Sequence, residues 1–147
     1  KVQITATYVS EKIAVILKNG SYDAKKLEVS EENYKRANGA KELSAYYKIE
    51  KTGIIRDPSL IANVEFRKLN INFDNAPQNI KLILFRNHLI YFNPTQQEKV
   101  LQLLHGSLSV SGHLVLGIRE RIAGAGTSRE FENVNEAESV YRKRMLN

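Results

Sequence analysis

Arg86 and Asn87 interrupt an apolar segment, LILFRNHLIYFNP over residues 82–94, with two strongly polar side chains. A guanidinium group donates hydrogen bonds to carboxylates and phosphates, and a carboxamide both donates and accepts them. Polar positions also follow two other β-rich segments, at Thr7-Tyr8 and at Asn70. Together, side chains of these types could hold a polar small molecule.

Each of these polar residues also has a local explanation. Asn70 could cap a turn, Tyr8 could pack at the rim of a sheet, and Arg86 could pair with a nearby carboxylate. For any one residue alone, the local explanation is the better one. However, all of them follow predicted strands, and parallel sheets of α/β proteins bind ligands beyond the carboxyl ends of their strands. We therefore interpret them as a shared ligand site.

The elements that must position these residues alternate between strands and helices. The β-branched segment KVQITATYV (1–9) predicts a strand, after which Ser10 is expected to cap a helix that ends at Gly20. In the polar stretch that follows, Ser30 predicts the start of a more exposed helix, and Asn38-Gly39 predicts its end.

An antiparallel element is expected next. The segment AYYKIEKTGIIRD (45–57) has two β-prone halves around Lys51-Thr52-Gly53, which is typical of a hairpin. We expect this hairpin to form an insert over residues 45–62. The alternating segment at 63–71 predicts a further strand.

The second half predicts a parallel α/β arrangement. The apolar run at 80–85 is expected to form a central strand of a parallel sheet, covered by helices on both faces. Asn93 and Pro94 predict the start of a helix, and residues 111–118 predict a buried strand after a turn at Gly112. The final segment could form a short terminal pairing or a helix. The predicted fold is α/β with a mostly parallel sheet.

Composition limits the possible functions. The 147 residues, 42% hydrophobic and 26% charged, fit a single domain over residues 1–147. No apolar stretch approaches the roughly 20 residues that cross a bilayer, so we expect a cytoplasmic protein without membrane insertion. There is no cysteine, and the three histidines lack metal-ligand spacing, so no metal is expected. The net charge of +6 is spread along the chain without a nucleic-acid-binding motif, so nucleic acid is not an expected partner.

Residues 84–120, LFRNHLIYFNPTQQEKVLQLLHGSLSVSGHLVLGIRE, resemble a stretch of the chemotaxis receptor methyltransferases, the CheR family. That stretch typically reads C-R-N-V-L-I-Y-F, an amphipathic helix and L-x-P-G-G-x-L-x-L-G-x-x-E. Upstream, residues 4–22 resemble the family's I-x-A-T-D-I-S and A-x-x-G-x-Y motifs, and residues 64–71 its V-x-F-x-x-x-N-L. The positions in register are Arg86, Asn87, Leu89, Ile90, Tyr91, Phe92, Leu108, Gly112, Leu114, Gly117 and Glu120.

This resemblance implies a partial class I, Rossmann-like methyltransferase fold and S-adenosylmethionine as cofactor. The family methylates glutamate side chains of chemoreceptors. Carried over by position, Asn70 and Ile71 would lie beside the adenine, Arg86 and Asn87 would line the cofactor pocket, and Tyr91 would face the methyl group. The expected partner is the cytoplasmic region of a chemoreceptor, whose tail peptide could add to the hairpin as a strand.

The chain also departs from the family pattern. Tyr8 stands where the family has an acid that holds the ribose hydroxyls, and Lys81, Phe85 and His88 also differ from it. The resemblance further implies that a central strand and a glycine-rich cofactor loop precede Lys1, so the domain is expected to be partial. Two functions stay open: a methyltransferase, or a degenerate CheR-like domain that acts as a binding or regulatory module. A binder of another nucleotide or of nucleic acid is a third alternative.

Overall fold

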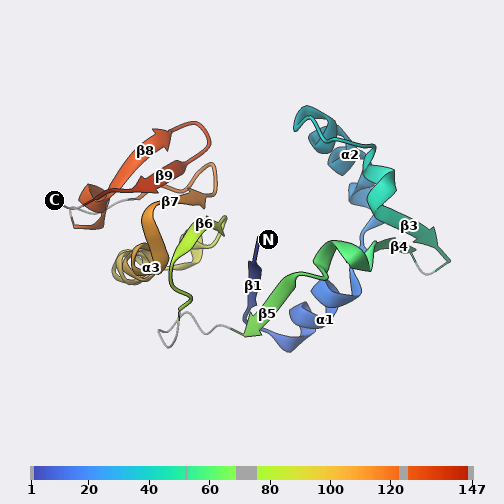
Figure 1. Cartoon of the computed structure of the whole chain (residues 1–147), viewed down its shortest axis with the longest axis horizontal. Helices are drawn as coiled ribbons and strands as arrows, with labels where there is room; N and C mark the ends of the chain where they lie inside the picture. Colours follow the sequence, from blue (N-terminus) through green and yellow to red (C-terminus); the bar gives the residue numbers. More distant parts are fainter. Residues whose placement is uncertain (1, 52, 69–75, 123–125, 146–147) are drawn as a thin grey trace. The chain divides into compact units, whose positions relative to one another are not determined.

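The computed structural model describes residues 2–51, 53–68, 76–122 and 126–145. Figure 1 labels its helices and strands. The chain divides into two compact units, Lys1–Asn70 and Ile71–Asn147, which are described separately below.

Unit 1 begins with a parallel strand pair joined through a helix. Strand β1 (Ile4–Tyr8) pairs in parallel with β5 (Val64–Lys68), so both strands end at the same edge of the sheet. Helix α1 (Glu11–Asn19) ends at Gly20, which has a left-handed φ of 69°. The predicted strand and helix are therefore confirmed. Ser10 is the N-cap residue of α1, as predicted, but among the described residues its side chain makes no capping hydrogen bond.

Helix α2 (Leu27–Arg36) starts earlier than the sequence suggested. The chain enters a 3-10 turn at Asp23, whose carboxylate accepts a hydrogen bond from the Lys25 amide, and the turn continues directly into the helix. Ser30 lies within the helix, where its hydroxyl donates to the Lys26 carbonyl at 2.8 Å. The predicted start at Ser30 is wrong, because Asp23 supplies the cap first.

The predicted hairpin is present and belongs to a three-stranded antiparallel sheet. Strands β3 (Tyr47–Glu50) and β4 (Gly53–Arg56) pair as expected, and β2 (Ser21–Tyr22) adds to β4, giving the order β2-β4-β3. Strand β3 is therefore an edge strand. The 3-10 turns of unit 1 are Ala24–Lys26, Leu43–Tyr46 and Pro58–Ile61.

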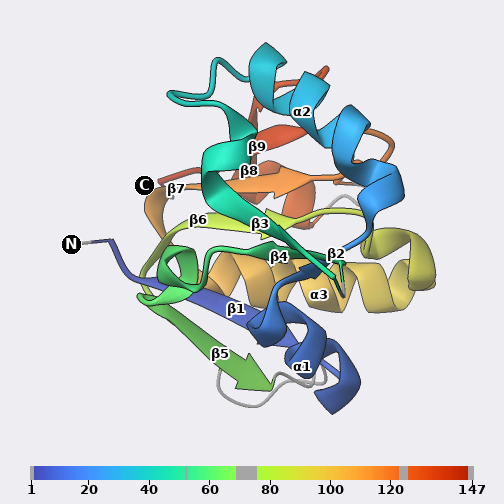
Figure 2. The ribbon, with the colours of Figure 1, turned by 90° about the vertical axis from the view of Figure 1, so that its right-hand side faces the viewer.

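Unit 2 contains one mixed sheet, seen beside α3 in Figure 2, with the strand order β6-β7-β9-β8. Strands β6 and β7 run parallel, and the other two neighbouring pairs are antiparallel. The end of the chain forms the β8-β9 hairpin, so the alternative of a terminal pairing is confirmed over that of a helix. The strands are β6 (Ile80–Phe85), β7 (Leu108–Leu116), β8 (Phe131–Asn135) and β9 (Val140–Lys143).

Strand β7 begins three residues before its predicted start at 111 and passes through Gly112 without a turn. Ser111 has a left-handed φ of 61°, and the β6-β7 register shifts between Ile80 and Leu82, which together form a bulge. A Cβ at Gly112 would lie 2.9 Å from the Ile80 carbonyl oxygen, so the glycine permits this close approach. The predicted turn is wrong because its residues are absorbed into the bulge.

Among the described residues, strand β6 lies at the edge of its sheet, so its predicted central place stays a prediction. It pairs with β7 alone among the residues that the structure describes, so its other edge has no partner there. Its Leu82 and Leu84 side chains are 55% and 68% exposed.

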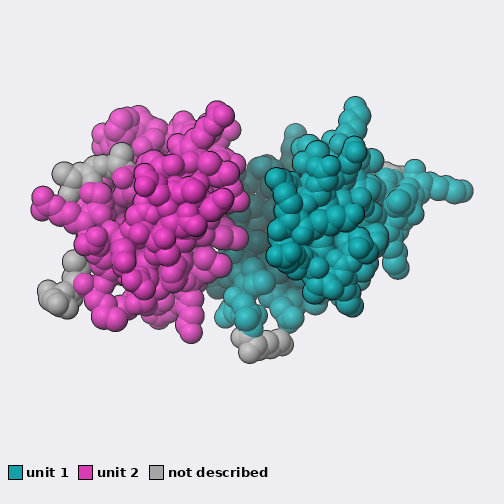
Figure 3. Space-filling view, turned by 90° about the horizontal axis from the view of Figure 1, so that it is seen from above, with its two compact units in different colours: residues 1–70 teal, residues 71–147 magenta. Residues whose placement is uncertain are grey.

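The main apolar core lies within unit 2. Helix α3 (Pro94–Ser107) starts as predicted, with Asn93 and Gln96 forming a reciprocal capping box. Its buried Val100 and Leu101 pack against the sheet through Leu114 and Leu116. The other buried members of this core are Leu89, Leu108, Phe131 and Tyr141. In unit 1, the buried apolar side chains among the described residues are Ala14 and Ile54. The two units are coloured separately in Figure 3.

Candidate functional site

The candidate site of unit 2 lies where β6 and β7 end together. Phe85 and Leu116 are paired across the two parallel strands, so the segments that follow leave the same edge of the sheet. We call residues 86–93 the β6 exit and residues 117–122 the β7 exit. Ligands of parallel α/β sheets bind at such an edge.

A buried carboxylate joins the two exits. Glu120, on the β7 exit, is only 4% exposed. One of its oxygens, Oε2, accepts hydrogen bonds from the amides of Asn87 at 2.8 Å and of Gly117 at 2.7 Å. The other, Oε1, accepts from the amide of Ile90 at 3.3 Å. A single side chain therefore satisfies three backbone donors from both exits.

The close approach of the two exits depends on Gly117. A Cβ at this position would lie 2.8 Å from Oε2 of Glu120 and 3.0 Å from the amide nitrogen of Asn87. It would also clash with the side-chain oxygen of Asn87, which thus faces the β7 exit. Asn87 has a φ of 58°, a left-handed conformation that asparagine tolerates better than most residues. The close packing of the two exits therefore depends on a glycine at 117 and is helped by an asparagine at 87.

Helix α3 holds the β6 exit from the other side. The Gln97 carboxamide donates to the carbonyls of Leu89 and Phe92, each at 3.0 Å. Leu89 is 2% exposed and anchors the 3-10 turn Leu89–Tyr91 in the core. The β6 exit is thus fixed at its start by Glu120 and at its end by Gln97.

Several predicted site residues of the β6 exit are exposed. Arg86 and Asn87 are exposed, and Tyr91 is 78% exposed. In the part of the chain that the structure describes, Arg86 forms no ion pair with a carboxylate, so the local explanation for it finds no support. Ile90 and Ile118 are also exposed there, at 61% and 53%. This edge therefore combines a cation, a phenol and apolar surface.

The remaining predicted site residues fall elsewhere. Tyr8 is the last residue of β1 in unit 1, at the edge where β1 and β5 end, and is partly buried. Asn70 and Ile71 lie outside the described residues. Arg86, Asn87 and Tyr91 therefore share one segment of unit 2, the β6 exit.

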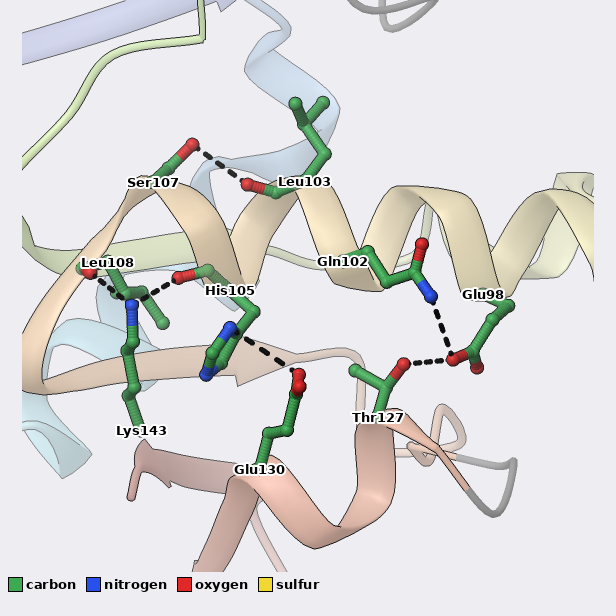
Figure 4. A network of polar contacts seen from close by, with 9 residues as sticks. All are labelled: Glu98, Gln102, Leu103, His105, Ser107, Leu108, Thr127, Glu130 and Lys143. Atoms are coloured by element: carbon green, nitrogen blue, oxygen red, sulfur yellow. Dashed lines mark hydrogen bonds and ion pairs between the residues drawn. The ribbon is translucent and has the colours of Figure 1, made fainter. Parts of the chain in front are cut away.

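A second polar cluster lies at the C-terminal end of α3 (Figure 4). Lys143 donates to the carbonyls of His105 and Leu108 at 2.8 and 2.9 Å. The His105 Nδ1 lies 3.4 Å from a Glu130 carboxylate oxygen, while its buried Nε2 has no hydrogen-bond partner among the residues that the structure describes. Burial lowers the pKa of His105 most, the nearby Lys143 lowers it further, and Glu130 opposes both. This cluster caps the C-terminal end of α3 through Lys143, and the half-buried His105 imidazole packs within it.

Across the described ranges, no group of His, Asp or Glu side chains is arranged to hold a metal ion. No described helix combines the length and apolar character that a membrane span requires.

The model of the CheR methyltransferase SAM-binding domain matches residues 1–140. The chain belongs to the CheR methyltransferase family. The parallel pair β1-β5 in unit 1 and the parallel pair β6-β7 in unit 2 are each consistent with the class I, Rossmann-like fold of that domain.

Two curated proteins illustrate the relation. The methyltransferase named Cher3 of Pseudomonas putida is 35% identical over 126 residues, which are 86% of this chain and 46% of that protein. Chemotaxis protein methyltransferase 1 of Pseudomonas aeruginosa is 30% identical over 123 residues, or 82% of this chain and 42% of that protein. This CheR chain therefore spans about half the length of the curated relatives it matches.

Among solved structures, the N-methyltransferase NodS of Bradyrhizobium japonicum in complex with S-adenosylhomocysteine is 19% identical. The match covers 60% of this chain and 58% of that one, with a TM-score of 0.47.

The role of Glu120 was missed by sequence reasoning, although its position was in register with the family's L-G-x-x-E motif. A signal was available, because a glycine and an acid three residues apart at a strand end suggest a tight turn with a carboxylate that binds backbone amides. The partners of that carboxylate on the β6 exit could not be identified, since they lie 33 and 30 positions away.

Proposed function

We propose that this CheR chain is the cofactor-binding part of an S-adenosylmethionine-dependent protein-glutamate O-methyltransferase of chemotaxis signalling, acting in the cytoplasm. The match of the CheR model to residues 1–140 carries this proposal. The polar side chains at the shared end of β6 and β7 support it.

The side chains at the exits are suited to such a cofactor. S-adenosylmethionine carries a carboxylate, an ammonium group, ribose hydroxyls and an adenine ring. The Arg86 guanidinium can donate to a carboxylate, and the Asn87 carboxamide can donate to or accept from a polar group of the ligand. Both lie on a segment whose backbone is held by Glu120. In the proposed arrangement Asn70 and Ile71 adjoin the adenine.

The bound cofactor would supply an electrophilic methyl group on a sulfonium centre. Transfer of this methyl group to a glutamate carboxylate oxygen of the acceptor would leave S-adenosylhomocysteine, with the electron pair of the former carbon–sulfur bond on sulfur. The acceptor is already nucleophilic, so the protein's contribution is to align it and to exclude water. We assign this part to Tyr91 and to the apolar side chains beside it, which are exposed on the β6 exit.

The proposed partner is the cytoplasmic region of a chemoreceptor. Strand β3 is an edge strand of its sheet, and Ile49 on it is 75% exposed. An exposed edge can accept an extended peptide as an additional strand, with main-chain hydrogen bonds supplying affinity and side-chain pockets supplying specificity. We propose that a receptor tail peptide adds to β3.

A second candidate function is a CheR-like binding or regulatory module without catalysis. Tyr8 favours it, because this residue ends β1 at a position where the family has a carboxylate. A phenol can accept a hydrogen bond, but it cannot bind both hydroxyls of a ribose as a carboxylate does. The two candidates therefore differ in the affinity expected for the cofactor.

Calorimetric titration of S-adenosylhomocysteine into the full-length protein tests the proposal. Saturable binding is expected, followed by transfer of labelled methyl groups from S-adenosylmethionine to receptor glutamates. Tyr8→Asp should strengthen binding by restoring the carboxylate, whereas Tyr8→Phe is the matched control and should not. Absence of binding by folded wild-type protein, with binding gained in Tyr8→Asp, would instead establish the degenerate module. Absence of binding by both would reject a cofactor site.

A further inference from the structure

Glu120 is a buried carboxylate that is surrounded by backbone amide donors. Removing a carboxylate from water is unfavourable unless hydrogen bonds replace its hydration. Here three backbone amides do so, while no Lys, Arg or His nitrogen of the described residues lies within ion-pair distance. Hydrogen bonds to a charged acceptor are stronger than those between neutral groups. The negative charge of Glu120 therefore matters for the shape of the backbone around it.

The three donors show which shape is fixed. The Asn87 and Ile90 amides belong to the β6 exit and the Gly117 amide to the β7 exit. The β7 exit is itself anchored, because Arg121 donates to the Ile118 carbonyl at 2.6 Å and to the Ser139 hydroxyl at 2.5 Å. Glu120 thus links the β6 exit by hydrogen bonds to the β7 exit, which Arg121 holds in place.

We infer that Glu120 is a positioning residue for the cofactor site: its carboxylate sets the backbone that presents Arg86, Asn87 and Tyr91. This inference rests on the proposed function. It assigns to Glu120 no contact with the cofactor, because the side chain is buried behind the exits. The consequence is that neutralising Glu120 should weaken cofactor binding even in a protein that remains folded.

The variant Glu120→Gln is nearly isosteric and isolates the charge. A carboxamide has only one acceptor oxygen. That oxygen can accept either from the Asn87 and Gly117 amides or from the Ile90 amide, and the NH2 group of the carboxamide would then face the amide or amides left without an acceptor. The β6 exit should shift locally as a result. Glu98→Gln is the matched control, since Glu98 in the same unit accepts hydrogen bonds from the side chains of Thr127 and Gln102 (Figure 4). Among the described residues it accepts none from either exit.

The test is titration of S-adenosylhomocysteine into full-length wild type, Glu120→Gln and Glu98→Gln, with thermal unfolding of each. We expect an affinity about tenfold lower or more in Glu120→Gln, corresponding to about 1.4 kcal/mol, and a change under about twofold in Glu98→Gln. In a double-mutant cycle, Glu120→Gln and Asn87→Gly should have non-additive effects on affinity. The reason is that Glu120 acts through the β6 exit, which carries the Asn87 side chain. A purely structural role would lower the melting temperature while leaving the affinity unchanged.

A wild-type measurement covers the case in which Glu120→Gln does not fold. Amide resonances of Asn87, Ile90 and Gly117 should shift when S-adenosylhomocysteine is added, and unshifted resonances would overturn the inference. Equal affinity of wild type and folded Glu120→Gln would also overturn it, while the proposed function would stand. No binding by wild type would instead reject the proposed function, and the inference with it.

Discussion

Asn87 combines two roles that can be separated by substitution. Its left-handed φ of 58° is a backbone requirement, and its side chain is a proposed ligand contact. Asn87→Ala should destabilise the fold by about 1 kcal/mol, because alanine lacks the short polar side chain with which asparagine tolerates this conformation, whereas Asn87→Gly should leave the free energy of unfolding nearly unchanged. Chemical denaturation measures both values.

Cofactor affinity then reports on the side chain of Asn87 alone. Asn87→Gly keeps the backbone conformation, so a loss of about tenfold in S-adenosylhomocysteine affinity is expected from removal of the carboxamide. Wild-type affinity in folded Asn87→Gly would remove this side chain from the proposed site and leave its packing against Gly117 as its role.

Gly117 should be among the positions of unit 2 least able to accept a side chain. Gly117→Ala places a methyl group 2.8 Å from a Glu120 oxygen and 3.0 Å from the Asn87 amide nitrogen, and neither neighbour can move freely. We expect a loss of about 1–3 kcal/mol in the free energy of unfolding.

Gly106 provides the matched control for Gly117. It lies in the last turn of α3, and a Cβ there would meet nothing within 4 Å. Gly106→Ala should leave stability unchanged or raise it by up to about 1 kcal/mol, because alanine is the better helix former. Equal effects of the two alanine substitutions on denaturation would contradict the tight packing of the two exits.

His105 should make stability depend on pH. Its pKa is lowered in the folded state, mainly by burial, so the unfolded chain binds more protons between the folded value and the ordinary 6.5. Stability therefore rises with pH across that window; the contribution is present above about 6.5 and is lost as the pH falls through the folded pKa. Denaturation of wild type and His105→Asn between pH 7.5 and 5 should show a steeper loss in wild type.

Glu130 opposes the lowered pKa of His105, which supplies a second comparison. Glu130→Gln should lower the pKa of His105 further, and this can be followed by NMR titration of the imidazole. An imidazole pKa that stays the same in Glu130→Gln would show that the 3.4 Å approach of the two side chains has no electrostatic effect.

At the scale of elements, the edge strand β3 yields a test of the proposed partner. Ile49→Asp places a charge on the exposed edge and should weaken binding of a receptor tail peptide by about tenfold or more, without changing affinity for S-adenosylhomocysteine. Leu60→Asp is the matched control, because Leu60 is an exposed apolar residue of the same unit, outside the strand. Fluorescence anisotropy with a labelled peptide measures both, and equal binding by Ile49→Asp would exclude β3 as the docking edge.

Elements governed by neighbouring residues could be predicted from the sequence. Asn93 and Pro94 start α3, and Gly20 ends α1, because caps depend on side chains within one turn. The starts of α2 and β7 were missed for different reasons. Asp23 caps a 3-10 turn that precedes α2, and the left-handed Ser111 lets β7 continue through a bulge.

The candidate site was predictable in part. Arg86 and Asn87 could be placed at a strand end, because an apolar run followed by polar residues is a local pattern. The hydrogen bonds from Glu120 to the β6 exit could not be predicted, since they depend on the pairing of β6 with β7. Tertiary pairing of this kind is not encoded in any short window of sequence.

At the scale of the whole molecule, the apolar edge of β6 predicts association. Leu82 and Leu84 are exposed, and the described residues supply no strand to the outer edge of β6. Unpaired apolar edges template further strand pairing. A chain of residues 1–147 alone should therefore self-associate at micromolar concentration, and sedimentation velocity should detect the oligomers.

A charge on β6 should reduce that association. Leu84→Lys is expected to shift the distribution toward monomer, whereas Val134→Lys, on β8 at the opposite edge of the same sheet, should not. A monomeric wild-type chain, or equal effects of both substitutions, would show that the β6 edge is not the associating surface.

The hydrogen bonds by which Glu120 joins the two exits also have a consequence for biosynthesis. A ribosome delivers Arg86, Asn87 and Tyr91 well before it delivers Gly117 and Glu120. A nascent chain halted between these points carries the side chains assigned to the cofactor but lacks the carboxylate that holds their backbone. The cofactor should therefore bind a nascent chain tightly only after β7 and its exit have been translated and folded.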